Sequence, residues 1–188
     1  VFFQSRDLAS VSIPDTVTVI RSNAFDSSGL TSIDLPKNLV EIGPYAFSDC
    51  DSLTKITIPE GVTTLHQFCF GYMDETELTV HIPNSLTEYK GGYGAFYGSN
   101  IKEVVFADGI TSILTRLFCG AKFQGALTLP DTVATIGQSA FAETTGLTAV
   151  TLPKGLTEIG QGVFFQSRDL ASVSIPDTVT VIRSNAFD

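Results

Sequence analysis

The chain has 188 residues, of which 43% are hydrophobic and 16% are charged, and its formal net charge is -9. The high apolar fraction excludes a disordered chain, and the acidic balance disfavours nucleic acid and anionic lipid as partners. No run of about 18 apolar residues is present, so we expect no membrane insertion of this chain, which begins at Val1 and which we interpret as a fragment.

Large apolar residues recur along the chain at fixed offsets from an anchor residue. They stand six, three and one positions before the anchor and three, six and eleven positions after it. Successive anchors are 22 to 24 residues apart, and this period predicts one solenoid over residues 1–188. The anchors are Pro14, Pro36, Pro59, Pro83, Ala107, Pro130, Pro153 and Pro176.

The residues before each anchor predict a short β-strand. In the first two repeats they read SVSIP and SIDLP, with β-branched and apolar residues in alternation. Proline cannot donate to a strand ladder, so the strand ends there and the chain turns. We therefore expect a right-handed coil of about eight 23-residue repeats, with one short parallel strand per repeat.

A phenylalanine follows each anchor, eleven residues later in seven repeats and thirteen residues later in repeat four. This constant offset favours an aromatic stack in the core, although an aromatic stripe that binds a ligand is the alternative. The eight residues are Phe25, Phe47, Phe70, Phe96, Phe118, Phe141, Phe164 and Phe187.

Repeat four departs from the regular spacing by a two-residue insertion in the segment 89–94. Tyr89, Tyr93 and Tyr97 lie in or beside this segment, which is also rich in glycine. Insertions in solenoids map to loops on one face, and exposed tyrosines are typical of protein-binding surfaces. We predict that these tyrosines bind a partner, and a tolerated surface loop is the alternative interpretation.

A second candidate surface is the open face of the predicted sheet. The residues two positions before the anchors are small and rich in hydroxyl groups, and they should point away from the core. Candidate partner-binding residues in this column are Thr57, His81, Thr128 and Thr151. The same pattern fits a sheet face that only contacts solvent.

The residues that could support catalysis or metal binding are few and scattered. His66 and His81 are the only histidines, and neither has an obvious nucleophile and carboxylate in its own repeat. The three cysteines, Cys50, Cys69 and Cys119, have neither the spacing of a disulfide framework nor that of a metal site. We therefore predict no enzyme activity, no metal site and no cofactor.

Residues 163–188 are identical to residues 1–26. The other repeats share only their apolar skeleton, so this identity indicates either recent duplication or engineering. No polar capping repeat follows Phe187, and solenoids need such caps for solubility. A structural or self-assembling scaffold, associating end to end, is therefore the alternative to a binding module.

The segment LTSIDLPKNLVEIGPYAFSDCDSL, residues 30–53, resembles the BspA-like leucine-rich-repeat family. All eight repeats match its pattern in part, so the resemblance covers the whole chain. It implies a secreted or cell-surface protein that binds host or neighbouring-cell proteins as an adhesin. It implies no catalytic residues.

Overall fold

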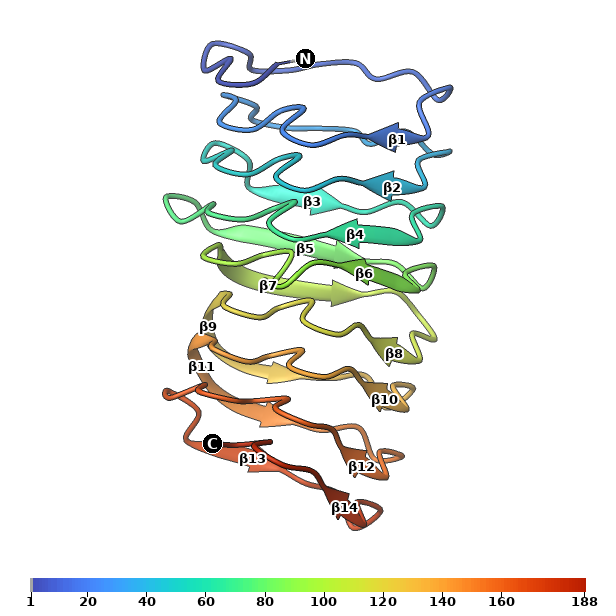
Figure 1. The fold of residues 1–188 in the computed structure, drawn as a ribbon, viewed down its shortest axis with the longest axis vertical. Helices are drawn as coiled ribbons and strands as arrows, with labels where there is room; N and C mark the ends of the chain where they lie inside the picture. Colours follow the sequence, from blue (N-terminus) through green and yellow to red (C-terminus); the bar gives the residue numbers. More distant parts are fainter. Residues whose placement is uncertain (1) are drawn as a thin grey trace.

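The computed structural model describes residues 2–188 and has the shape of a ladder of stacked coils (Figure 1). Each coil is one sequence repeat, and the chain passes from the first coil at one end of the stack to the last at the other. Fourteen parallel strands form on two sides of the coil, and the described residues contain no helix. The predicted repeat solenoid is confirmed. Between residues 2 and 188, accordingly, no helix could cross a membrane.

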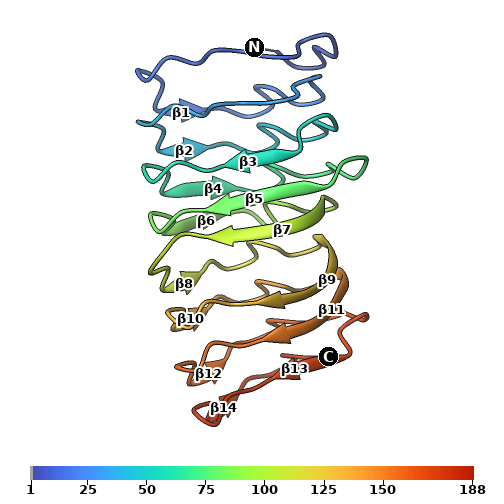
Figure 2. The same cartoon turned by 180° about the vertical axis from the view of Figure 1, so that it is seen from behind.

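The first side of the coil carries the strands that the sequence predicts before each anchor. They form one parallel sheet in the order β13-β11-β9-β7-β5-β3 (Figure 2). Inward-facing residues such as Ile56 and Val80 are fully buried, while their neighbours point to solvent. The strands are β3 (Lys55–Thr57), β5 (Leu78–Ile82), β7 (Asn100–Phe106), β9 (Lys122–Thr128), β11 (Thr145–Thr151) and β13 (Ser172–Ser174).

Repeats one and two differ from the prediction on this side, because residues 10–13 and 32–35 form no strand. Directly before these segments, one backbone hydrogen bond connects the two repeats, from Thr31 N to Ala9 O at 3.1 Å. A hollow of about 450 Å³ lies between residues 31–35 and β3, so the ladder does not continue beyond β3. Val11 and Ile33 nevertheless point inward, since both are half-buried against the core.

The second side carries a strand that the sequence analysis did not assign. Every repeat has one, two or three residues long, about five to seven residues after the anchor. Each of these strands except β14 places an apolar side chain in or against the core, for example Ile42 and Leu65, whereas both residues of β14 are exposed. The strands are β1 (Val19–Ile20), β2 (Glu41–Ile42), β4 (Thr64–His66), β6 (Glu88–Lys90), β8 (Ser112–Ile113), β10 (Thr135–Ile136), β12 (Glu158–Ile159) and β14 (Val181–Ile182).

The third side of the coil contains no strand and is held by the phenylalanine stack. Neighbouring rings lie parallel, with centroids 5.1 to 5.7 Å apart, and Phe2 adds a ninth ring to the predicted eight. Backbone hydrogen bonds connect the repeats here, for example from Phe47 N to Cys69 O at 2.8 Å. Six of the rings are at most 1% exposed, so the stack is core and not a ligand-binding stripe.

Both sheets are interrupted in the middle of the stack. On the second side, β6 does not pair with β8 and β10 does not pair with β12, so the sheet divides into three parts. On the first side, β7 and β9 pair only at Asn100–Lys122 and Ile101–Phe123, and then they diverge (Figures 1 and 2). The phenylalanine stack continues through this region, from Phe96 to Phe118 at 5.5 Å. Repeat five is therefore joined to repeat four on the first side and to repeat six on the second.

Candidate functional site

The outer face of the first sheet carries the predicted column of polar residues. Thr57 aligns with His81, and Thr128 aligns with Thr151, each across one pair of strands. The threonines are exposed and His81 is half-exposed. Because β7 and β9 diverge, the four residues form two separate pairs and not one continuous row.

A shallow hollow of about 590 Å³ surrounds His81 on this face. Its wall includes both signs of charge, and Lys102 Nζ lies 2.7 Å from Glu77 Oε2. The hydrogen bond from this ammonium lowers the pKa of Glu77 below its ordinary value. Because its lining holds two lysines and two glutamates, the hollow offers no dominant charge to a ligand. It is lined by Thr54, Lys55, Glu77, Thr79, His81, Lys102, Glu103 and Val105.

The clearest surface feature is an aromatic cluster on the third side of the coil, formed by Tyr45, Phe68, Tyr72, Tyr93 and Tyr97. Phe68 is its centre and is 4% exposed. Tyr45, Tyr93 and Tyr72 stack on Phe68 with ring centroids 4.8, 5.0 and 5.4 Å away. Tyr97 packs edge-on against Phe68 at 5.5 Å. Tyr72 and Tyr93 remain 43% and 52% exposed, so the cluster presents aromatic surface to solvent.

Three members of the aromatic cluster have a left-handed backbone. Tyr45, Phe68 and Tyr72 all have φ of 57°. A large L-residue in this conformation costs about 1 kcal/mol, and glycine would avoid the cost. The equivalents of Tyr45 in other repeats also have positive φ, and they are Asn23, Arg116, Ser139, Gly162 and Asn185. The left-handed backbone is therefore a feature of the repeat, and its cost is not special to the cluster.

Two glycines make room for the tyrosine rings. A Cβ atom on Gly120 would lie 2.2 Å from Tyr97 Cδ2, and one on Gly98 would lie 3.1 Å from Tyr72 Cδ1. The equivalent positions of other repeats also have positive φ but carry side chains, so backbone conformation alone does not demand glycine. Those residues are Ser27, Asp49, Glu143 and Gln166. Gly120 is thus explained by the ring of Tyr97.

The inserted segment supplies one edge of the aromatic cluster. Gln67 Oε1 accepts a hydrogen bond from Gly92 N at 3.0 Å, and Arg116 Nη1 donates to Gly92 O at 2.7 Å. Tyr89 differs from its predicted neighbours, because it is half-buried against the core and its hydroxyl donates to the carbonyl of Tyr93. Burial raises the pKa of the Tyr89 hydroxyl. The structure therefore brings Tyr93 and Tyr97 together on the surface and makes Tyr89 a support beneath them.

Carboxylates flank the aromatic cluster at both ends. Asp26 lies near Tyr45, and Glu143 lies near Tyr97. The pKa of each of these two tyrosines is raised, first by burial and then by neighbouring tyrosines and the nearby carboxylate. Asp49 precedes Tyr72 by one repeat in the same column and bonds to Gly71 O through its backbone N at 2.9 Å.

The histidines and cysteines do not assemble into a reactive site. His66 Nε2 lies 2.9 Å from Glu41 Oε1, a neighbour from the preceding repeat that the sequence analysis missed. All three cysteines are buried thiols, and burial raises the pKa of Cys119 to about 11. Among residues 2–188, no three His, Cys, Asp or Glu residues converge on a point where a metal could bind.

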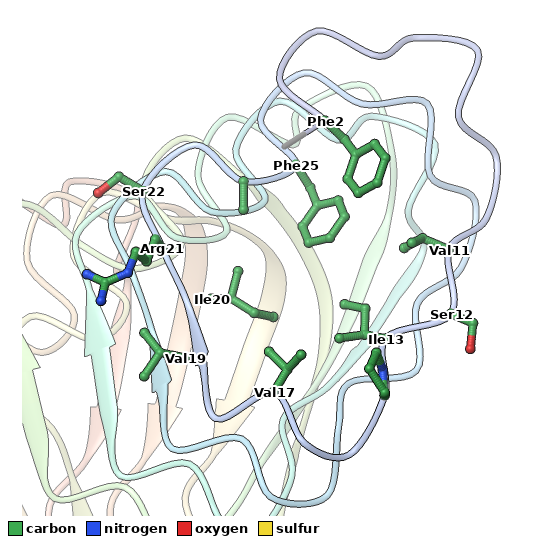
Figure 3. Close-up of a pocket in the computed structure, with 12 residues that line it drawn as sticks. Phe2, Val11, Ser12, Ile13, Val17, Val19, Ile20, Arg21, Ser22 and Phe25 are labelled. Atoms are coloured by element: carbon green, nitrogen blue, oxygen red, sulfur yellow. The ribbon is translucent and has the colours of Figure 1, made fainter.

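An apolar cleft of about 480 Å³ opens at the N-terminal end of the stack, where Phe2, Val11, Ile13 and Phe25 point into it (Figure 3). In the identical sequence 163–188, the equivalent of Val11 pairs with Val150 of repeat seven in the parallel ladder. The same apolar side chains therefore face a neighbouring repeat in the second block and a cleft in the first.

A family model described as "BspA type Leucine rich repeat region" matches residues 1–124 and 125–188. A search of curated proteins returns no match. The sequence signal thus lies in the repeat pattern over the full length of the chain.

Two solved structures illustrate the structural likeness. A leucine-rich repeat protein of T. pallidum is 22% identical, with a TM-score of 0.51 over 88% of this chain and 67% of that protein. A leucine-rich cell surface protein of Faecalibacterium prausnitzii is 22% identical, with a TM-score of 0.47 over 93% of this chain and 69% of that protein. The first of these likenesses supports the fold.

Proposed function

Because the chain belongs to the BspA-type leucine-rich repeat family, we propose that it is a non-enzymatic protein-binding module of a cell-surface or secreted protein. The surface location is what the family resemblance implies. In this proposal the partner is an extracellular or host protein, and it is bound through the aromatic cluster. The module needs no cofactor for this role.

One observation carries the proposal: Tyr72 and Tyr93 expose about half of their side chains on a rigid stack of coils. Tyrosine gives a large amphipathic contact at a small cost in side-chain entropy, and it is enriched among residues that dominate binding energy. The space that Gly98 and Gly120 leave for the rings of Tyr72 and Tyr97 favours a selected surface over a tolerated loop.

The experiment compares two faces of the same molecule against immobilised extracellular-matrix and serum proteins. The variant Tyr72→Ser/Tyr93→Ser should weaken a bound partner by about 2 kcal/mol, or roughly thirtyfold in Kd. The matched control is Thr128→Ala/Thr151→Ala, which changes two exposed residues of the first sheet. Thermal unfolding of each variant shows whether the fold is intact.

Binding through the aromatic cluster and binding through the first sheet predict opposite results for the two variants. If the threonine variant loses the partner and the tyrosine variant keeps it, the first sheet is the binding face and the proposal is wrong. The proposal is equally wrong if binding of the partner depends on Thr57 and His81, which lie on the same sheet beside the hollow.

Self-association is a second candidate function, favoured by apolar residues at the C-terminal end of the stack. Ile182 and Phe187 are 55% and 42% exposed there. Light scattering over a concentration series tests this candidate. Growth of the scattering mass with concentration supports association of copies, and a constant monomer mass removes it.

A further inference from the structure

The aromatic cluster lies between carboxylates. On one side, Ser27 Oγ lies 2.9 Å from Asp49 Oδ2 and 3.3 Å from Asp26 Oδ1, so its one proton is shared between two neighbouring carboxylates. On the other side, Glu143 is exposed and lies near Tyr97. Both aspartates are half-buried, so solvent ions screen their charges only in part.

Two arginines lie near these acids, and among residues 2–188 neither forms an ion pair with Asp26, Asp49 or Glu143. Arg6 lines a hollow of about 270 Å³ together with Ser27 and Asp49. Arg116 donates to the backbone carbonyl of Gly92 at 2.7 Å, and this contact fixes the inserted segment. Its guanidinium is thus engaged with a neutral acceptor. Asp26 and Asp49 are bonded to neutral hydroxyl and amide groups, from Ser27 and Asn23. The surface of the aromatic cluster therefore combines exposed ring faces with carboxylates that lack a cationic partner in these contacts.

Such a surface discriminates between partners by charge. The face of a tyrosine ring attracts a guanidinium or ammonium group, and a neighbouring carboxylate adds to that attraction. An anionic segment would meet like charges, and the whole chain carries a net charge of -9. A neutral apolar segment could cover the rings, but it would leave the carboxylates partly desolvated without compensation.

We propose that the aromatic cluster binds a basic segment of the partner protein, with an arginine or lysine side chain stacked on Tyr72 or Tyr93 and held by Asp49 or Glu143. This inference rests on the proposed function and adds the chemistry of the partner. The partner segment is cationic, and its recognition combines ring stacking with ion pairing.

The tyrosines themselves provide the readout. The chain has five tyrosines and no tryptophan, and four of the tyrosines belong to the aromatic cluster while Tyr89 lies directly beneath it. Intrinsic tyrosine fluorescence therefore reports on this surface alone. The probe is a seven-residue peptide of alternating glycine and arginine, and the matched peptide replaces each arginine by citrulline, which has nearly the same shape and no charge.

The arginine peptide should give a saturable fluorescence change at low salt, and the citrulline peptide should give a Kd at least about fivefold higher. The variant Asp49→Asn/Glu143→Gln should raise the Kd of the arginine peptide by about fivefold. The control variant Glu103→Gln/Asp108→Asn removes the same net charge from exposed positions of repeat five and should leave the Kd unchanged.

The outcomes distinguish a failure of the basic-segment inference from a failure of the proposed function. Equal binding of the two peptides, or an equal loss in the control variant, overturns the basic-segment inference. If a protein partner is lost on Tyr72→Ser/Tyr93→Ser but retained on Asp49→Asn/Glu143→Gln, the binding function stands and the inference fails. If neither variant affects the partner, both are wrong.

Discussion

Residues 1–26 and 163–188 have the same sequence and opposite faces buried. Phe2 is 39% exposed and its counterpart Phe164 is 1% exposed. Ile20 is 4% exposed and its counterpart Ile182 is 55% exposed. In the first block the face toward repeat two is covered, and in the second block the face toward repeat seven is covered.

This comparison shows that burial in the solenoid is a property of the neighbour and not of the repeat. Each repeat exposes two apolar faces that only adjacent repeats can cover, so stability is a sum of nearest-neighbour terms. The same substitution made in the two blocks should therefore have different costs. Two pairs of variants test this directly, because the local sequence is constant.

The largest difference should come from the phenylalanine stack. Phe164→Ala removes a ring packed between Phe141 and Phe187 and should lower the free energy of unfolding by about 3–5 kcal/mol. Phe2→Ala removes a ring that stacks only on Phe25 and should cost about 1 kcal/mol. Denaturant unfolding of both variants measures the difference. Equal losses would show that position in the stack does not determine the cost.

The isoleucine pair should reverse the order of the two blocks. Ile20 lies in β1, which pairs with β2, and Ile20→Ala should cost about 2–4 kcal/mol through the cavity that it leaves. Ile182→Ala removes a side chain that is more than half exposed and should cost less than about 1 kcal/mol. Unfolding curves of both proteins give the comparison. A larger loss for Ile182→Ala would mean that its exposed face is covered in solution.

The repeat and the core could be predicted from sequence because they depend on spacing alone. The phenylalanine column recurs at one offset, and the ring stack follows from it. The second strand was missed because it contributes only two or three residues per repeat, too few for an alternation to be visible. The segments before Pro14 and Pro36 form no strand because a strand needs a ladder partner there, and local sequence does not reveal whether one is present.

The candidate site was predicted in part. The density of tyrosine and glycine near residue 93 identified Tyr93 and Tyr97, but Tyr45 and Phe68 lie in other repeats. A signal for them exists, because both stand nine residues after their anchors and so share one column. Tyr89 could not be distinguished from Tyr93 by sequence, since the direction of its side chain depends on how the insertion folds.

The smallest expected difference between the identical blocks concerns their arginines. Arg183 donates through Nη2 to Glu158 Oε2 at 2.9 Å and through Nε to the other carboxylate oxygen. Arg21 is exposed, and residues 2–188 place no equivalent of Glu158 beside it. The hydrogen bond from Arg183 lowers the pKa of Glu158 below 4.5, so the pair stabilises the fold above that pH and loses its effect as the pH falls through the lowered value. Arg183→Gln should therefore lower the Tm slightly at neutral pH and low salt, whereas Arg21→Gln should leave it unchanged. Thermal melts at neutral and acidic pH measure both variants, and a deficit in Arg183→Gln that persists in acid would assign the effect of Arg183 to packing instead of charge.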